Sequence, residues 1–393
     1  MRFHIINIIV FTIIWMGSIN SLYSQDIRIG LFEDRLVNTI VFHSVTGGHD
    51  VISDDKVILS LKKAELIYIS YIGSMLSIHD GTRNYGLFDF IRIDDVTEKG
   101  LFNLKIVDPT SDARDYQGDI EVFTNNSVLQ IINELPLENY LAGVVETEGG
   151  PGAPTEYYKA QAILCRTYAL KHWNRHESQN FNLCDDTHCQ SYKGINDENS
   201  LIFEAVLSTH KLVINNMKYT LINPSFHSNS GGETQRADDI WGNGEEYLQA
   251  VLDPYSEKQK NSRWSKTISL VEWRNYIFTK TVGDTSKLRN ENFLVEQNHR
   301  KKFLIAGTDT LLLADIRKDW DFRSSFFSME LKNDSILISG KGYGHGVGMS
   351  QEGAIEMAKQ GFSYADIIKF YYDMINISDI DDLPDNSLPV PFR

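Results

Sequence analysis

The first third of the chain alternates apolar and polar residues in short runs. Gly, Asn and Asp separate runs that are rich in β-branched and aromatic side chains, at residues 27–32, 39–43, 57–61, 65–71 and 118–123. Such runs are typical of strands, and their short connections favour an antiparallel sheet. We therefore predict a β-rich region over residues 25–125.

The period of the pattern lengthens after Pro154. Thr155 can cap a helix over residues 156–175, in which apolar positions recur at helical spacing. Cap signals predict two shorter helices at residues 351–360 and 363–372. Short strands lie between these helices, so we predict an α+β fold.

The predicted domains follow from these elements. After the β-rich N-terminal region, a mixed helix-on-sheet core is predicted over residues 126–378. Residues 379–393 lack periodicity. This predicts an extended or disordered tail.

Another apolar run, at residues 135–147, ends in Glu148 and is followed by a turn rich in Gly and Pro. This pattern places one carboxylate at the mouth of a loop, where functional residues are concentrated. Glu146 would share a face with Glu148 if the segment were a strand. A carboxylic acid in a partly desolvated site can deliver a proton, so both are candidate acids.

The 393-residue chain carries a formal net charge of −15, with 42% hydrophobic and 23% charged residues. Its length allows one large or two modest globular domains. The negative charge argues against nucleic acid as a partner, because that ligand requires Lys and Arg to neutralise phosphates. An uncharged or amphoteric ligand such as a glycan fits this composition better.

Residues 1–24 begin with Met-Arg, continue through an apolar stretch and end in small residues. A basic start, an apolar region shorter than a comfortable bilayer span and a small-residue junction predict a cleavable signal peptide. An uncleaved membrane anchor is the alternative. Both predict that the body of the protein is exported to the periplasm or cell envelope.

Three segments together resemble the SpoIID/LytB family, named for stage II sporulation protein D. They are residues 135–170 with Lys-Ala-Gln-Ala and Arg-Thr-Tyr-Ala-Leu, His-Ser-Asn-Ser-Gly-Gly-Glu-Thr at 227–234, and Gly-Tyr-Gly-His-Gly-Val-Gly-Met-Ser-Gln at 342–351. The resemblance extends over residues 120–375. It implies a peptidoglycan lytic transglycosylase, which cleaves MurNAc–GlcNAc glycan strands to 1,6-anhydro products and requires no cofactor for catalysis.

The resemblance also implies which acid is used. Glu148 matches the single catalytic glutamate of the family, in the pattern Gly-Val-Val-x-x-Glu. Family members usually continue Glu-Met-Pro, whereas this chain continues Glu-Gly-Gly-Pro-Gly-Ala-Pro. The difference predicts a longer and more flexible loop after the acid.

Further matches to the family imply contacts with substrate. The turn at 227–234 gathers hydroxyls, an amide and glycines, which suits sugar hydroxyls and N-acetyl groups. Glycine at every second position from 342 to 348 would strip one face of a strand and place His345 on the other. We predict that Glu148, this turn and this glycine strand share one groove. Gln161 and Arg166 have an alternative role, in which they brace the loop of the acid. Trp241 is an alternative to Tyr247 for stacking on a sugar. The predicted substrate contacts are Gln161, Arg166, Ser228, Ser230, Thr234, Tyr247, His345, Ser350 and Gln351.

The three cysteines have two expected roles. Cys165 falls on the buried face of the predicted helix and is expected in the core. Cys184 and Cys189 lie in a segment that resembles a zinc-binding segment of some family members. Two thiolates and an imidazole of His176 or His188, of which we favour His176, would suit a structural zinc ion. A disulfide between Cys184 and Cys189, or two free thiols, are the alternatives in an exported chain.

Two other functions fit the same sequence. The protein can be a non-catalytic glycan-binding or amidase-activating protein of the cell wall, because some members of the family are described as amidase enhancers. It can also be a hydrolase, which would need a second carboxylate such as Glu146 or Glu233 across the cleft. Peptidoglycan glycan strands and a cell-wall amidase are the expected partners, and a sporulation role does not follow from the sequence.

Overall fold

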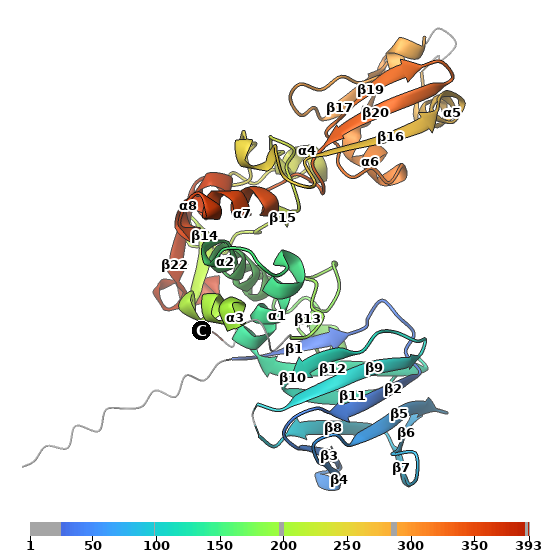
Figure 1. The fold of residues 1–393 in the computed structure, drawn as a ribbon, viewed down its shortest axis with the longest axis vertical. Coiled ribbons are helices and arrows are strands. Elements are labelled where there is room, and N and C mark those ends of the chain that lie inside the picture. Colours follow the sequence, from blue (N-terminus) through green and yellow to red (C-terminus); the bar gives the residue numbers. More distant parts are fainter. Residues whose placement is uncertain (1–24, 98, 196–199, 284–288, 390–391, 393) are drawn as a thin grey trace, which may run out of the picture.

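The computed structural model describes residues 25–97, 99–195, 200–283, 289–389 and 392. The predicted signal peptide, residues 1–24, lies outside the described residues. The described chain is elongated, with a β-sandwich at one end, helices in the middle and a small β unit at the other end (Figure 1). Helices and sheets are both present in quantity, and the α+β prediction is confirmed.

The sandwich contains the first twelve strands and the short strand β13. A seven-stranded sheet has the order β13-β1-β12-β11-β8-β3-β4, and a six-stranded sheet has the order β10-β9-β2-β5-β6-β7. The strands are β1 (Asp26–Leu31), β2 (Thr39–Ser44), β3 (His49–Ser53), β4 (Lys56–Leu61), β5 (Leu66–Ile72), β6 (Met75–His79), β7 (Asn84–Phe88), β8 (Phe90–Asp95), β9 (Leu101–Asp108), β10 (Arg114–Gln117), β11 (Asp119–Asn125), β12 (Val128–Pro136) and β13 (Leu183–Cys184).

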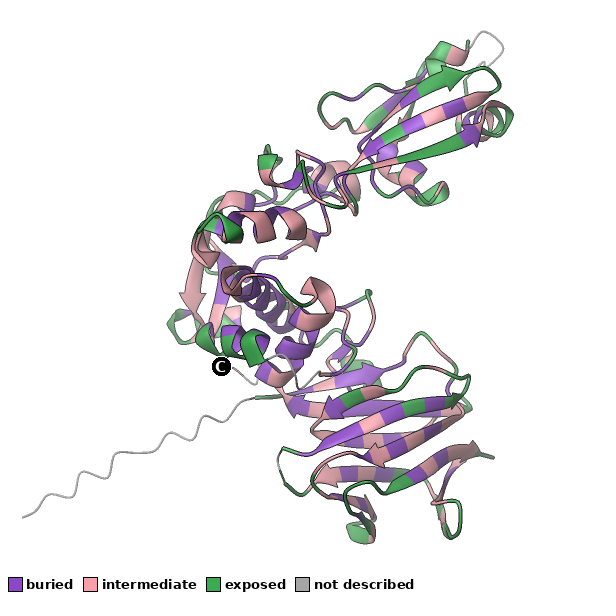
Figure 2. Ribbon diagram, in the orientation of Figure 1, coloured by how far each residue is buried: buried purple, intermediate pink, exposed green. Residues whose placement is uncertain are grey.

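Alternation of side chains explains how these strands form a core. Ile40 and Phe42 of β2 and Ile67 and Ile69 of β5 are fully buried, while their neighbours in sequence are partly exposed. This alternation gives each sheet one inward face, and Figure 2 shows it as bands of buried and exposed residues. Strand β13 forms one edge of the seven-stranded sheet and pairs in parallel with β1. It thereby attaches the segment after α2 to the sandwich.

Helices follow the sandwich directly, since β12 ends at Pro136 and α1 begins at the next residue. The central part contains α1 (Leu137–Gly149), α2 (Thr155–Lys171), α3 (Ser200–Ser208), α4 (Ala237–Trp241), α7 (Gln351–Lys359) and α8 (Tyr364–Tyr371), with the strands β14 (Leu212–Asn216), β15 (Phe226–His227), β21 (Met349–Ser350) and β22 (Ile375–Asp379). Most positions of α2 are buried, so this helix is surrounded by the other elements. The predicted helices at 156–175, 351–360 and 363–372 are thus present, the first ending earlier.

The segment before Glu148 differs from our expectation of a strand or loop. It forms α1, because Leu137, Tyr140, Leu141 and Val144 recur at three- and four-residue spacing and are buried together. Glu148 therefore lies in the last turn of a helix. Each residue of an α-helix advances by about 100°, so Glu146 and Glu148 point to different sides of α1.

Residues 263–341 form a separate unit, which we call the inserted unit. It contains β16 (Arg263–Ser269), α5 (Leu270–Lys280), β17 (Phe303–Ala306), β18 (Asp309–Leu312), α6 (Leu313–Asp319), β19 (Phe327–Lys332) and β20 (Ser335–Lys341). A second hydrophobic core holds it together, and Trp273 is fully buried there. We had not predicted this unit from the sequence, because it lies within the core predicted over residues 126–378.

Two further expectations are corrected. The segment from Gly342 to Gly348 is not a strand, because all four alternating glycines have positive φ, from 69° to 109°. At Gly348 a Cβ would lie 1.9 Å from the carbonyl oxygen of Ser225, so only glycine fits. The described part of the C-terminal tail is ordered: Leu383 and Leu388 are buried, and the ring of Phe392 lies 5.0 Å from that of Trp173.

Candidate functional site

A cavity of about 800 Å³ lies beside the last turn of α1. It is bounded by α1, the end of α2, the loop that follows β13, the segment 223–226, α4 and α6. Residues that are far apart in the sequence therefore meet here. The lining residues are Glu148, Tyr168, His172, Arg175, Thr187, His188, Cys189, Gln190, Asn223, Pro224, Ser225, Phe226, Trp241, Arg317 and His345.

Glu148 is the only carboxylate among the described residues that line this cavity. Burial raises the pKa of its carboxyl group, and the hydrogen bond from Ser191 offsets part of that rise. The backbone N–H of Ser191 donates to Glu148 Oε1 over 3.1 Å. A carboxyl group with a raised pKa holds its proton at higher pH and can donate it.

The backbone around Glu148 is fixed from two sides. Gln351 Nε2, at the start of α7, donates to the carbonyl oxygen of Glu148 over 2.9 Å. The Tyr158 hydroxyl donates to the carbonyl of Gly150 over 2.8 Å and accepts from the N–H of Ala153 over 3.0 Å. These bonds hold the loop after Glu148 despite its glycines.

The rings of Trp241 and His345 lie on another wall of the cavity. Trp241, which is 48% exposed, lies 5.3 Å from the ring of His345, and His345 lies 5.5 Å from His227. Burial lowers the pKa of His345 to about 4. Its Nδ1 accepts the N–H of Val347 over 3.1 Å, so its Nε2 carries the proton and donates to the carbonyl of Phe226 over 2.9 Å. His345 is therefore a neutral, fully bonded ring rather than an acid or base.

Two guanidinium groups bring positive charge to the cavity. Arg175 donates to the hydroxyl of Tyr168 over 2.8 Å, and Arg317 of α6 donates to the carbonyl of Arg323 over 3.3 Å. Neither forms an ion pair with a carboxylate of the described residues. Burial also lowers the pKa of Arg317, so its charge is held in a partly desolvated place.

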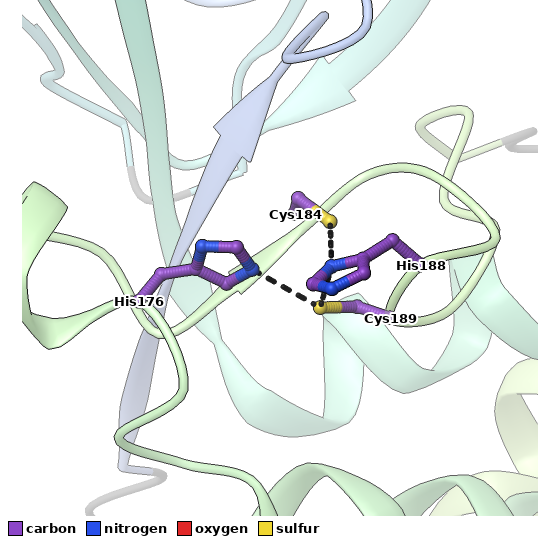
Figure 3. Close-up of side chains that lie close together, drawn as sticks. All are labelled: His176, Cys184, His188 and Cys189. Carbon is purple, nitrogen blue, oxygen red and sulfur yellow. Dashed lines mark hydrogen bonds between the residues drawn. The ribbon is translucent and has the colours of Figure 1, made fainter.

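Four possible metal ligands meet at the edge of the same cavity (Figure 3). The ligand atoms of His176, Cys184, His188 and Cys189 all lie within 4.8 Å of one another. Cys189 Sγ is 3.4 Å from His176 Nε2, and His188 Nδ1 is 3.6 Å from Cys184 Sγ and 3.7 Å from Cys189 Sγ. The two sulfurs are not joined. His176 and His188, which the sequence offered as alternatives, are both part of the cluster.

This donor set fits a zinc ion. Two thiolates and two imidazoles match a tetrahedral structural site. A hydrogen bond between the cysteines lowers the pKa of Cys189 to about 7 and raises that of Cys184, so Cys189 is the readier thiolate of the pair. The Nδ1 of His176 is 2.6 Å from Gln179 Oε1, an outer contact of the kind that orients a metal-bound imidazole.

The sequence of this chain is similar to those of known proteins. The profile of the SpoIID family, described as stage II sporulation protein, matches residues 125–215. Stage II sporulation protein D of Bacillus subtilis is 32% identical over 271 residues, which span 64% of this chain and 77% of that protein. This chain belongs to the SpoIID/LytB family.

Two other members show how wide the likeness is. An uncharacterized protein of Brachyspira hyodysenteriae is 31% identical to this SpoIID/LytB chain over 293 residues, 72% of this chain and 79% of that protein. The amidase enhancer of Bacillus subtilis is 26% identical over 286 residues, 59% of this chain and 39% of that protein. The matched profile contains α1, α2 and the metal-ligand cluster.

Two predicted substrate contacts of this SpoIID/LytB chain lie in the core instead. Gln161 and Arg166 of α2 are 0% and 1% exposed. Arg166 forms two bonds with the carboxylate of Glu138, of 3.1 and 2.5 Å, and Gln161 contacts Tyr157 and Cys165. Arg166 thus joins α2 to α1, and Gln161 bonds within α2 itself. Within the described residues, neither side chain bonds to the loop after Glu148, so the alternative role of bracing that loop is not shown for them.

The turn at 227–234 lies behind the cavity rather than on it. Ser230 and Thr234 are buried, and their hydroxyls bond to Asp253 and to the backbone of residues 249 and 251. Ser228 Oγ accepts from Asn261 over 3.4 Å, and Ser350 caps α7 while bonding to Ser230 and Ser256. The structure therefore brings Glu148 and His345 to one cavity and does not place this turn on it.

The other predicted substrate contacts are also divided between the core and the surroundings of Glu148. Tyr247 is buried, and its hydroxyl accepts the N–H of Asn223 over 2.9 Å, whereas Trp241 lines the cavity. The side-chain amide of Gln351 donates to the backbone carbonyl of Glu148. Sequence reasoning missed Ser191, Arg175 and Arg317. Ser191 lies two residues after Cys189, so the Cys-His segment could have pointed to it. No sequence pattern linked Arg317 of the inserted unit to Glu148.

Proposed function

We propose that this protein is a peptidoglycan lytic transglycosylase with Glu148 as its acid and base. The observation that carries the proposal is one carboxyl group with a raised pKa in a cavity of about 800 Å³. A glycosidase of the usual kind needs two carboxylates across the bond. A transglycosylase needs only one, because the substrate supplies its own nucleophile.

Hydrolysis would require one further carboxylate, and both candidates for it are poorly placed. Glu146 does not line the cavity. Glu233 lies near Arg300, whose backbone N–H donates to Glu233 Oε2 over 3.0 Å, and its carboxylate is 3.4 Å from His299. Glu233 also does not line the cavity. These positions favour the transglycosylase over the hydrolase.

The reaction needs two proton transfers. Protonated Glu148 donates to the glycosidic oxygen as the bond to C1 of N-acetylmuramic acid breaks. The C6 hydroxyl of the same sugar then attacks C1 and closes the 1,6-anhydro ring, and the Glu148 carboxylate takes the hydroxyl proton. Glu148 ends in its starting state, and no water is consumed.

The cavity offers contacts that suit such a strand. Trp241 exposes a ring on which a sugar can stack. Arg175 and Arg317 can bind the carboxylate of the lactyl group on N-acetylmuramic acid. The neutral ring of His345 adds an apolar surface between Trp241 and His227.

We also propose that the cluster of His176, Cys184, His188 and Cys189 binds zinc as a structural ion. Four protein ligands would fill a tetrahedral ion, which supplies stability rather than chemistry. Metal analysis of purified protein should find about one zinc per chain, and Cys184→Ser should lose it. Zinc-free protein with a mass two hydrogens below the reduced form would establish a disulfide instead.

Incubation with glycan strands freed of peptide tests the proposed reaction. Mass analysis should find 1,6-anhydro ends. Reducing ends would identify a hydrolase. The proposed place of action is the cell envelope, with glycan strands as the partner.

A second candidate function rests on a relative. The amidase enhancer of Bacillus subtilis shares 26% identity with this chain. An intact glycan after incubation, together with faster cleavage of peptidoglycan by a cell-wall amidase, would favour this amidase-activating role.

A further inference from the structure

A second cavity, of about 670 Å³, lies on the outer face of the seven-stranded sheet. Side chains of β1, β8 and β11 form its floor, and the segment 174–182 that follows α2 forms its other wall. We call it the sheet-face cavity. Its lining residues are Arg28, Phe90, Glu121, Phe123, Asn174, Glu177, Asn180, Phe181 and Asn182, none of which lines the Glu148 cavity.

A pair of aromatic rings lies on the floor. Phe90 of β8 is directly opposite Phe123 of β11 in the antiparallel register. Their ring centroids are 6.4 Å apart and the rings are 27° from parallel. Phe90 is 42% exposed. The pair therefore presents a flat apolar surface to whatever enters the cavity.

Polar side chains with unused hydrogen-bonding capacity lie on the other wall. Asn182 is occupied: its Oδ1 accepts the N–H of Arg28 and its Nδ2 donates to the carbonyl of Trp173. Within the described residues, the side chains of Asn174, Glu177 and Asn180 form no hydrogen bond. Two amides and one carboxylate can thus serve a ligand that offers many hydroxyls.

The charges of the lining disfavour a negatively charged group inside the cavity. The guanidinium of Arg28 is bound to Glu121 over 2.6 Å and to Glu134 over 2.9 Å. Its positive charge is thereby neutralised, and Glu177 adds a negative charge to the wall. A neutral ligand with apolar faces and hydroxyl edges fits this combination of rings, amides and carboxylate.

We propose that the sheet-face cavity binds a carbohydrate chain. Arg175, which lies within the segment that forms its wall, lines the Glu148 cavity, and so do residues 187–190, which follow that segment. Between the two cavities, the ring of His176 stacks on Phe181 at 4.8 Å. One segment thus separates two binding sites. The choice of the peptidoglycan strand as the natural chain rests on the proposed function, whereas the site itself does not. In that strand a neutral N-acetylglucosamine unit, not a lactyl carboxylate, would occupy this cavity, because Arg28 is already paired.

A second binding site would increase the residence time of the protein on a polymeric substrate. A strand held in the sheet-face cavity raises the effective concentration of its other segments near Glu148. Short substrates that fill only the Glu148 cavity would gain nothing from it. Cleavage of long strands should therefore depend on Phe90 more than cleavage of short ones.

Hydrogen exchange on the Glu148→Gln variant tests the site with a tetrasaccharide of N-acetylglucosamine as the probe. We expect protection of residues 174–182 and of β8. Phe90→Ala should abolish that protection, as should the double change Asn174→Ala and Glu177→Ala, whose exposed positions do not threaten folding. Phe303→Ala is the matched control, because Phe303 is 39% exposed on the inserted unit and lines neither cavity.

The decisive results are separate from those for catalysis. A tetrasaccharide that leaves residues 174–182 unprotected at millimolar concentration, or protection that survives both Phe90→Ala and the double change, overturns the proposal. Protection lost in these variants and kept in Phe303→Ala supports it, whether or not the parent protein makes anhydro ends. Failure to make anhydro ends with the protection intact would instead remove the proposed function alone.

Discussion

Glu148 and Asp253 are two carboxyl groups whose pKa is raised by burial, yet their surroundings differ. Glu148 lines a cavity of about 800 Å³ and receives one hydrogen bond, from Ser191. Asp253 is 0% exposed and accepts from the hydroxyls of Ser230 and Ser256. A raised pKa therefore does not distinguish the proposed acid from Asp253. What distinguishes Glu148 is that it lines a cavity.

The Asp253 cluster explains why so many polar residues of the family motifs lie away from the cavity. Ser256 Oγ is 2.7 Å from Ser350 Oγ, and Ser350 caps α7, the helix that starts with Gln351. At Gly353 in the first turn, a Cβ would lie 2.8 Å from Asp253 Oδ2. This cluster fixes α7 and thereby the bond from Gln351 to Glu148.

The largest expected effect is that of Glu148→Gln. The amide is nearly isosteric but has no acidic proton, so the rate of cleavage should fall by roughly a hundredfold or more. The measurement is the yield of anhydro ends from peptide-free glycan. Circular dichroism should show an unchanged fold, because the side chain faces a cavity.

Glu146→Gln is the matched control for this variant. It lies two residues earlier on α1 and does not line the cavity. Its cleavage rate should stay within about twofold of the parent. Loss of cleavage in Glu146→Gln with activity kept in Glu148→Gln would move the acid by two residues and end the comparison in its present form.

Asp253→Ala should have the opposite result. Removing this buried acceptor leaves the hydroxyl of Ser230 without its acceptor and the hydroxyl of Ser256 with Ser350 alone. Each buried group left unsatisfied costs about 1–3 kcal/mol. Urea unfolding should show a free energy of unfolding lower by roughly 2–4 kcal/mol. The rate per folded molecule should remain near that of the parent. A hundredfold loss of rate in folded Asp253→Ala would show that this carboxylate has a catalytic role.

The sequence predicted elements better than it predicted exposure. The helices after residue 154 have clear caps and periods, so their approximate bounds followed from local physics. The position of Ser230 did not, because a serine that binds sugar and one that binds Asp253 have the same local sequence. Its exposure depends on Asp253 and Ser350, which are distant along the chain.

The inserted unit shows the same limit. Arg317 reaches the Glu148 cavity only because residues 263–341 fold as one unit between β15 and β21. Neither charge nor spacing relates α6 to α1. In contrast, His176, Cys184, His188 and Cys189 lie within fourteen residues, so their meeting could be expected from sequence, although not that both histidines would join.

A smaller effect is expected for Arg317→Gln. If the guanidinium binds a lactyl carboxylate, its loss should raise the KM for peptide-free glycan about tenfold, equivalent to about 1.4 kcal/mol. The value of kcat should change less, because binding rather than proton transfer is affected. Arg317→Lys should restore part of the affinity.

Arg274→Gln is the control for charge on the inserted unit. Arg274 of α5 lies over the ring of Phe278 at 5.6 Å and does not line the cavity. An equal rise in KM for this variant would mean that Arg317 acts through net charge, and the cavity contact would be withdrawn.

The smallest expected effect is on the pH dependence of the free energy of unfolding, to which both Glu148 and Asp253 contribute. Below the ordinary values of 4.5 for Glu148 and 3.8 for Asp253, folded and unfolded chains are both protonated. As pH rises above those values the unfolded chain releases its protons first, so the free energy of unfolding falls until each folded pKa is passed. The loss is at most about 1.4 kcal/mol for each unit of pKa difference.

Glu148→Gln and Asp253→Asn should each remove part of this loss, so each variant should gain stability relative to the parent between pH 4 and 7. The cleavage rate of the parent should fall as pH rises through the folded pKa of Glu148, because a general acid must be protonated. Asp253→Asn should leave that profile in place, since Asp253 touches no ligand. A stability curve that both variants alter, beside a rate profile that depends on Glu148 alone, would separate a raised pKa from access to substrate. A rate profile that shifts in Asp253→Asn would show that the two carboxyl groups are coupled through α7 and Gln351.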